Sequence, residues 1–194
     1  MNTIDNPGMP SPLVLSGSST IYFFGYGSYR SKERVAEILG HVPFGGYGGI
    51  IDGYVLTFQT LDQLPAEPKE ILEKIWGDSF RAYTIRPEKG LVAGVVWELT
   101  EADMKKIRVW EFDGVWREFP DVVVKTSDGR TIHALTDVAL PNQQVKHVVD
   151  GLYYQNNMNA QGKKSKKDEY RIHDTKRARK MLENIVLSKN EENK

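Results

Sequence analysis

The segment FFGYGSYR, residues 23–30, joins an apolar run to a glycine turn, and the expected fold is built outward from it. Residues 21–24 are β-branched or aromatic and end at Gly25, a pattern that predicts a buried strand. Ser31 is then placed to cap a helix over residues 32–39. A glycine-rich turn between a strand and a helix can direct its backbone amides at an anionic ligand.

Five residues of this turn are candidates for contacting such a ligand: Tyr26, Gly27, Ser28, Tyr29 and Arg30. A tight turn without any ligand is the alternative, because glycine-rich turns are common. The turn matches neither phosphate-binding fingerprint, since it has neither G-x-x-x-x-G-K nor G-x-G-x-x-G. The residues of the turn alone therefore leave both interpretations open.

The rest of the chain predicts an α+β fold. Strands are expected over residues 48–60, over residues 80–100 on both sides of a Pro-Glu-Lys-Gly turn, and over residues 119–140 as a hairpin. Thr100 and Asp103 have the spacing of a capping box and predict a helix over residues 101–110. Residues 61–79 contain a short helical piece and resemble an insertion or a flap. Because the elements do not alternate as βαβ units, the sheet should be mixed or antiparallel.

The composition predicts one domain with two extensions. The chain has 194 residues and 40% apolar content, which is enough for one globular core. This domain is expected over residues 20–155, after a flexible segment over residues 1–19. Residues 156–194 form a basic extension, whose apolar positions between 178 and 186 predict a terminal helix. Such a helix would dock on the body or on a second copy of the chain, which leaves a homodimer open.

Several classes of site and partner are not expected. The chain has no cysteine, which excludes disulfides, thiol nucleophiles and thiolate metal sites. Its 26 Lys and Arg balance 26 Asp and Glu, so neither nucleic acid nor an anionic membrane is an expected partner. The four histidines lack metal-ligand spacing, and no metal site is predicted. No apolar run reaches about 20 residues, and no signal peptide is visible, so a soluble cytoplasmic protein is expected.

Glu111 is the candidate for acid–base chemistry. It follows the predicted helix over residues 101–110 and has Trp110, Phe112 and Trp116 as near neighbours. A carboxyl group among large apolar side chains should have a raised pKa and could exchange protons near neutral pH. A surface carboxylate is the alternative, although the helix dipole disfavours a negative charge at a helix C-terminus.

Four segments in order along residues 20–140 resemble motifs of the gamma-glutamyl cyclotransferase-like superfamily, which includes gamma-glutamylamine cyclotransferase-like proteins. YFFGYGSYR resembles the family's opening YxAYGSNL, and DGYVLTF, residues 52–58, resembles its second strand. Residues 85–111 resemble the block that ends in the family's acid, and residues 115–138 resemble the hairpin that follows.

The resemblance implies a small mixed β-barrel or sheet of about five to seven strands with helices packed around it. It implies an enzyme that cyclises a γ-glutamyl amine or peptide to 5-oxoproline and releases the amine, without a metal or an organic cofactor. The family's acid corresponds to Glu111, which would be the general acid and base. The loop over residues 26–30 would hold the glutamyl head with its backbone amides.

Several positions depart from the family's motifs. Tyr29 and Arg30 replace Asn-Leu, Phe112 replaces the Gly after the acid, and Trp116-Arg117 replaces Tyr-x-Arg. The chain could therefore act on a different γ-glutamyl compound, or be an inactive module of the same fold that binds a small anion. A third hypothesis is an interaction protein whose basic extension contacts an acidic partner or RNA.

Overall fold

The computed structural model describes residues 19–76 and 80–147. The predicted flexible segment over residues 1–19 and the predicted basic extension with its terminal helix lie outside the described residues, apart from residue 19. The first half of the described chain contains β1 (Ile21–Gly25), the 3-10 turn η1 (Gly27–Arg30), α1 (Lys32–Leu39), β2 (Phe44–Thr60), η2 (Leu61–Gln63) and α2 (Ala66–Trp76). The second half contains β3 (Arg81–Leu99), α3 (Glu101–Trp110), β4 (Arg117–Glu118), β5 (Asp121–Thr126), β6 (Thr131–Leu135), β7 (Val138–Ala139) and β8 (Lys146–His147).

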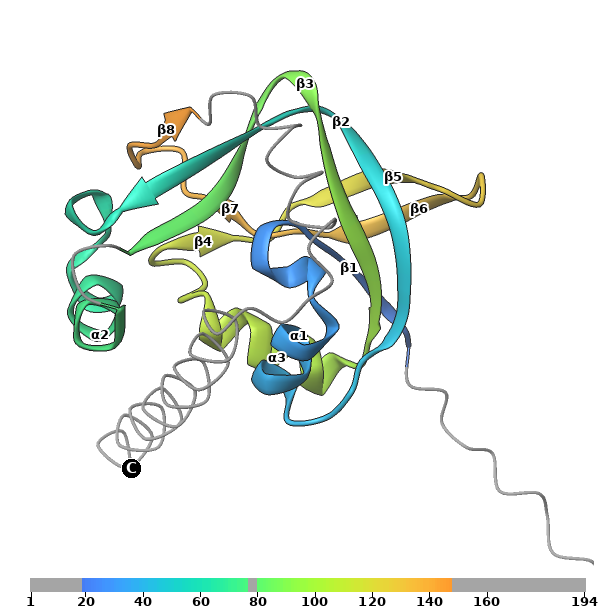
Figure 1. Ribbon diagram of the computed structural model, residues 1–194, viewed down its shortest axis with the longest axis horizontal. Helices are drawn as coiled ribbons and strands as arrows, with labels where there is room; N and C mark the ends of the chain where they lie inside the picture. Colours follow the sequence, from blue (N-terminus) through green and yellow to red (C-terminus); the bar gives the residue numbers. More distant parts are fainter. Residues whose placement is uncertain (1–18, 77–79, 148–194) are drawn as a thin grey trace, which may run out of the picture.

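Five strands close into a barrel. Their order is β3-β1-β6-β5-β2, and β2 pairs back with β3 along nearly the whole length of both strands. The β1–β6 pair is parallel and the other pairs of the barrel are antiparallel, so the sheet is mixed. β8 pairs with the far end of β2, while β4 and β7 form a separate two-stranded ribbon. The predicted α+β fold with a mixed barrel is confirmed (Figure 1).

Residues 88–90 form a bulge inside β3, and the prediction of a Pro-Glu-Lys-Gly turn between two strands is wrong there. β2 pairs with β3 on both sides of this segment, and three residues of β3 lie opposite Gly53 alone. Gly53 has a φ of 80°, which suits glycine, and Pro87 has no N–H to continue the ladder. The long partner strand therefore keeps both halves of the segment in one bent strand.

β1 is buried on both faces, as its continuous apolar run predicts. Phe24 points into the barrel and Phe23 points outward against α1 and α3, because successive strand residues face opposite sides. The two helices begin as predicted: the Ser31 hydroxyl accepts the Arg34 N–H, and the capping box at Thr100 is present. β1 therefore fixes the glycine loop between the barrel and the two helices.

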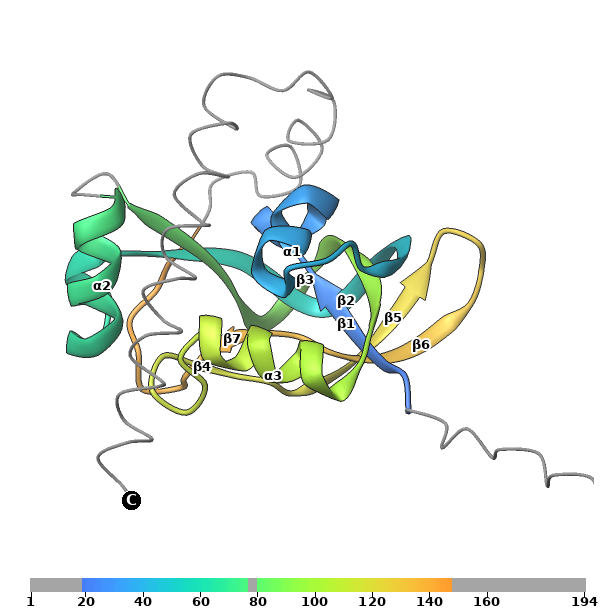
Figure 2. The same ribbon diagram turned by 90° about the horizontal axis from the view of Figure 1, so that it is seen from below.

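A third apolar cluster joins the segment after β2 to the end of α3. Its buried members are Leu61, Leu64, Ile71, Leu72, Phe112 and Trp116. α2 lies apart from α1 and α3 in both views (Figure 1 and Figure 2). The short helix expected within residues 61–79 is confirmed as α2.

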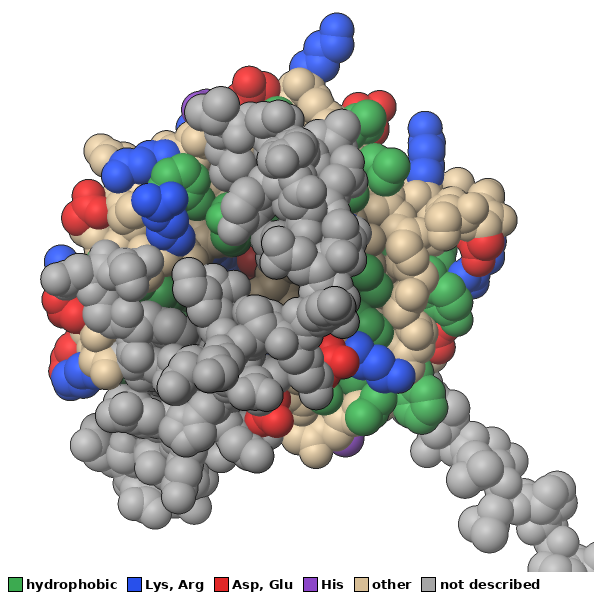
Figure 3. Space-filling model, viewed as in Figure 1, with side chains coloured by type: hydrophobic (Ala, Val, Ile, Leu, Met, Phe, Trp, Pro, Cys, Tyr) green, Lys and Arg blue, Asp and Glu red, His purple; other side chains and the backbone are tan. Residues whose placement is uncertain are grey.

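None of the described helices is both long and apolar enough to cross a membrane. On the face shown in Figure 3, the described residues mix basic and acidic side chains.

Candidate functional site

Glu111 is the C-cap residue of α3 and is 6% exposed. The helix end is closed by two backbone hydrogen bonds, one from the Phe112 N–H to the Val109 carbonyl and one from the Asp113 N–H to the Arg108 carbonyl. This is the Schellman arrangement, in which the residue after the C-cap takes a left-handed conformation. Because Glu111 is buried, the alternative of a surface carboxylate at this helix end is wrong.

Phe112 occupies the left-handed position with a φ of 52°. A side chain in this left-handed conformation costs about 1–2 kcal/mol. The Phe112 ring is buried and meets the Trp116 ring edge to face at a centroid distance of 6.4 Å. The burial of this ring against Trp116 opposes the cost of the backbone conformation.

Tyr29 connects the glycine loop directly to Glu111. Its hydroxyl donates a hydrogen bond of 2.5 Å to Glu111 Oε1, across a sequence separation of 82 residues. The Tyr29 backbone is held from the other side, because Trp97 Nε1 donates to the Tyr29 carbonyl at 2.8 Å. The Tyr29 side chain is thus long enough to reach Glu111 from the glycine loop.

A second carboxyl group, that of Asp137, lies beside the first. Arg117 Nε is 3.6 Å from Glu111 Oε2 and 3.9 Å from Asp137 Oδ2. The Tyr26 hydroxyl donates to Asp137 Oδ2 at 2.9 Å and to the Asp137 carbonyl at 2.5 Å. The pairing of β4 with β7 places Arg117 next to the chain around Asp137. We call Glu111, Asp137, Arg117, Tyr26 and Tyr29 the acid cluster.

Burial, and after it the negative charge of Asp137, together raise the pKa of the Glu111 carboxyl to about 7, against the opposing effects of Arg117 and the Tyr29 hydroxyl. Burial also raises the pKa of Asp137, against the effects of Arg117 and Tyr26. A carboxyl group with a pKa near 7 is present in both its acidic and its basic form at neutral pH, as an acid–base group requires.

The five predicted loop residues differ in their placement. Tyr26 and Tyr29 are buried and bind the two carboxyl groups, Gly27 is buried with a φ of 55°, Ser28 is exposed and Arg30 is half-buried. The Tyr29 N–H donates to the Tyr26 carbonyl, so this amide is used inside η1. The amides of Gly27 and Ser28 precede that bond and have no acceptor within the turn. Of the backbone amides predicted to contact an anion, those of Gly27 and Ser28 are therefore the two that remain as candidates.

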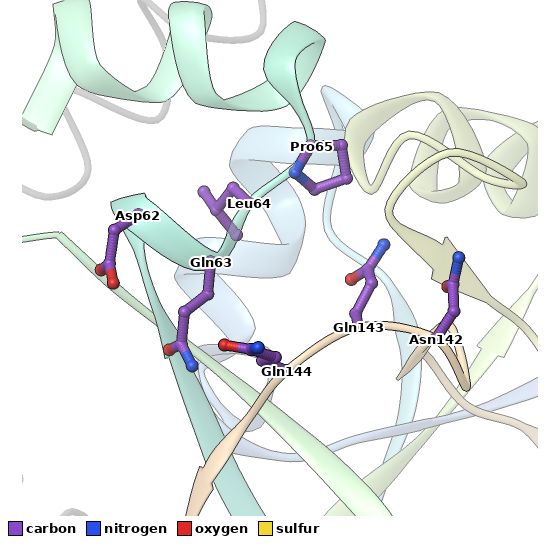
Figure 4. Close-up of a pocket in the computed structure, with 7 residues that line it drawn as sticks. All are labelled: Asp62, Gln63, Leu64, Pro65, Asn142, Gln143 and Gln144. Atoms are coloured by element: carbon purple, nitrogen blue, oxygen red, sulfur yellow. The ribbon is translucent and has the colours of Figure 1, made fainter.

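An open pocket of about 390 Å³ is lined by residues 62–65 and 142–144 (Figure 4). Gln59 links residues of this pocket to Arg117 of the acid cluster. Its side-chain nitrogen donates to Gln143 Oε1 and to the Gln144 carbonyl, and its side-chain oxygen accepts from Trp116 and Arg117. Glu111 does not line this pocket.

Replacing Tyr29 by Phe is expected to raise the pKa of Glu111. The lost hydroxyl donates to the ionised carboxylate, and its removal disfavours that charged form. The measurement is a ¹³C NMR titration of the labelled Glu carboxyl groups, with Glu111→Gln to assign the signal. A Glu111 pKa equal to or below that of the unchanged protein would contradict the hydrogen bond. Tyr22→Phe is the control, because Tyr22 lies on β1 outside the acid cluster.

Replacing Gly25 by Ala is expected to destabilise the protein by about 1–3 kcal/mol. A Cβ at this position would lie 2.5 Å from the Tyr29 Cβ and 2.8 Å from the Tyr29 carbonyl oxygen, so η1 would have to move. Urea denaturation measures the loss. Gly48→Ala is the matched control in β2, because its nearest neighbour would be 3.7 Å away. Equal stability of the two variants would show that Gly25 is not held by this contact.

Sequence reasoning missed Asp137 and did not assign a role to Arg117. A signal for Asp137 exists in ALTDVAL, residues 134–140, where one acid stands among apolar residues. A charged residue in such a run needs a partner when it is buried. Arg117, 20 residues before it, is the buried base that supplies one.

No protein-family model and no curated protein matches the chain. Solved structures do match it. One described as gamma-glutamyl cyclotransferase has a TM-score of 0.54 and 20% identity, over 80% of this chain and 99% of that chain. An uncharacterized protein from Homo sapiens has a TM-score of 0.54 and 19% identity, over 79% of this chain and 98% of that chain. A protein from Arabidopsis thaliana has a TM-score of 0.52 and 15% identity, over 75% of this chain and 87% of that chain.

Proposed function

Since the chain has the gamma-glutamyl cyclotransferase-like fold, we propose that it cyclises a γ-glutamyl amine or peptide to 5-oxoproline and releases the amine. Glu111 would be the catalytic acid and base, and the loop over residues 26–30 would hold the glutamyl head. The observation that carries the proposal is the hydrogen bond of 2.5 Å from Tyr29 to Glu111, which brings loop and acid together in one buried site.

The reaction needs little more than positioning and proton transfer. The α-amino nitrogen of the substrate attacks its own γ-carbonyl carbon, and the bond from that carbon to the leaving nitrogen breaks. The attacking and attacked groups belong to one molecule, so holding the substrate folded supplies much of the rate. No water is consumed, because one proton moves from the attacking nitrogen to the leaving nitrogen.

Glu111 is suited to carry this proton. In its ionised form the carboxylate accepts a proton from the attacking amine, and in its neutral form the carboxyl returns it to the leaving amine. A pKa of about 7 means that roughly half of the molecules are in each form at pH 7, so neither transfer is strongly uphill. Tyr29 donates to Oε1 at 2.5 Å and Arg117 Nε lies 3.6 Å from Oε2, so Oε2, which has the longer contact, would be the oxygen that takes the substrate's proton.

The amides of Gly27 and Ser28 are proposed to bind negative charge on the substrate. They lie at the start of η1, within the loop whose Tyr29 hydroxyl touches the acid. They could bind the α-carboxylate of the glutamyl head or the oxyanion that forms at the γ-carbon. Arg30, on the same turn, adds a positive charge, and burial lowers its pKa.

The test is incubation of the full chain with a panel of γ-glutamyl amines and γ-glutamyl amino acids. We expect 5-oxoproline and the free amine in equal amounts from at least one of them. Thermal unfolding with each compound shows whether it binds. Binding without product would favour the inactive anion-binding module, and the absence of both from the whole panel would overturn the proposal.

A further inference from the structure

The acid cluster holds one more carboxyl group than the proposed reaction uses. Arg117 is 1% exposed and its Nε lies within 4 Å of an oxygen of both Glu111 and Asp137. This Nε makes no hydrogen bond to any described residue, although two ion pairs compete for it. Each carboxyl group accepts one tyrosine hydroxyl, Glu111 that of Tyr29 and Asp137 that of Tyr26.

The charges of the cluster do not balance when both carboxyl groups are ionised. The titratable and charged groups that face each other are Glu111 from the end of α3, Asp137 from the chain before β7, Arg117 from β4, and the two tyrosines from the loop after β1. Two anions and one cation leave a net negative charge in a buried place, and that charge is costly to bury. One retained proton makes the cluster neutral.

We propose that Asp137 is a positioning residue that sets, together with Arg117, the proton affinity of Glu111, so that the two carboxyl groups titrate as one unit. The catalytic consequence rests on the proposed function of Glu111. Arg117 can form an ion pair with either carboxyl group when that group is ionised. In the form with both carboxyl groups ionised, the uptake of one proton by Glu111 leaves Asp137 paired with Arg117 and makes the cluster neutral, so no buried cation is left unpaired.

The experiment compares Asp137→Asn with the unchanged protein. The amide keeps the acceptor for the Tyr26 hydroxyl but removes the negative charge, and Arg117 is then left to Glu111 alone. We expect the titration of the ¹³C-labelled Glu111 carboxyl to move down by about one pH unit or more. The pH at which kcat/KM reaches half of its maximal value should fall by the same amount. Asp121→Asn, an exposed acid on β5, is the control and should move neither curve.

A titration of Glu111 that does not move in Asp137→Asn would overturn the inference. If this variant does not fold, the unchanged protein decides, because coupled groups show the same two steps in both carboxyl signals. Independent single steps in the Glu111 and Asp137 signals would also overturn it. The NMR titration needs no substrate. A protein that shows the coupling but makes no 5-oxoproline would refute the proposed function alone.

Discussion

Replacing Glu111 by Gln is expected to lower kcat by about 10²–10⁴, because a positioned acid–base group contributes a factor of this size. The amide has nearly the same shape and can still accept the Tyr29 hydroxyl, but it cannot take up the proton of the attacking amine. The rate of 5-oxoproline formation measures the loss. Circular dichroism and thermal unfolding should show an intact fold, since Asp137 still pairs with Arg117 in the variant.

Glu98→Gln is the matched control for this prediction. Glu98 is a half-buried acid on β3 that also accepts a tyrosine hydroxyl, that of Tyr47 at 2.8 Å, but it lies outside the acid cluster. It should keep the kcat of the unchanged protein. Turnover that survives Glu111→Gln would remove Glu111 from the mechanism, while an equal loss in both variants would point to a general effect on the fold.

Much of the fold could be predicted because its signals are local. The apolar run of β1, the serine that caps α1 and the Asp-Gly pair of the β5–β6 turn each act within a few residues. Residues 87–90 show the limit of such signals. Pro and Gly are common in both turns and bulges, so the local sequence does not distinguish the two. The bulge forms here because β2 pairs with β3 on both sides of it, and no local pattern predicts that pairing.

In the candidate site, too, the features with local sequence signals could be predicted and those that depend on distant contacts could not. Glu111 could be singled out because its apolar neighbours are adjacent in sequence. The contact from Tyr29 to Glu111 could not be predicted, since it depends on how β1 and α3 pack. Arg117 and Asp137 meet through β4 and β7, which are two residues long each and too short to leave a periodic pattern. Long-range packing therefore completes a site of which the sequence shows one half.

Replacing Arg117 by Met is expected to lower the free energy of unfolding by about 3–5 kcal/mol at pH 8. Met has a similar length but no charge, so Glu111 and Asp137 would remain buried without their cation. The loss should be smaller at pH 5. Without Arg117, the pKa values of both carboxyl groups rise further in the folded protein, which then binds more protons than the unfolded chain. Stability must then fall as the pH rises through these raised pKa values.

Urea denaturation at the two pH values measures this difference, and Arg130→Met is the matched control. Arg130 forms an exposed ion pair with Asp128, and exposed pairs contribute little to stability, so its loss should be much smaller. The triple variant Glu111→Gln, Arg117→Met, Asp137→Asn should regain much of the stability at pH 8, because neutral side chains do not need the cation. A loss in Arg117→Met that is the same at pH 5 and pH 8 would contradict the charge argument. The defect would then be one of packing around Trp116, whose ring lies 4.2 Å from the guanidinium.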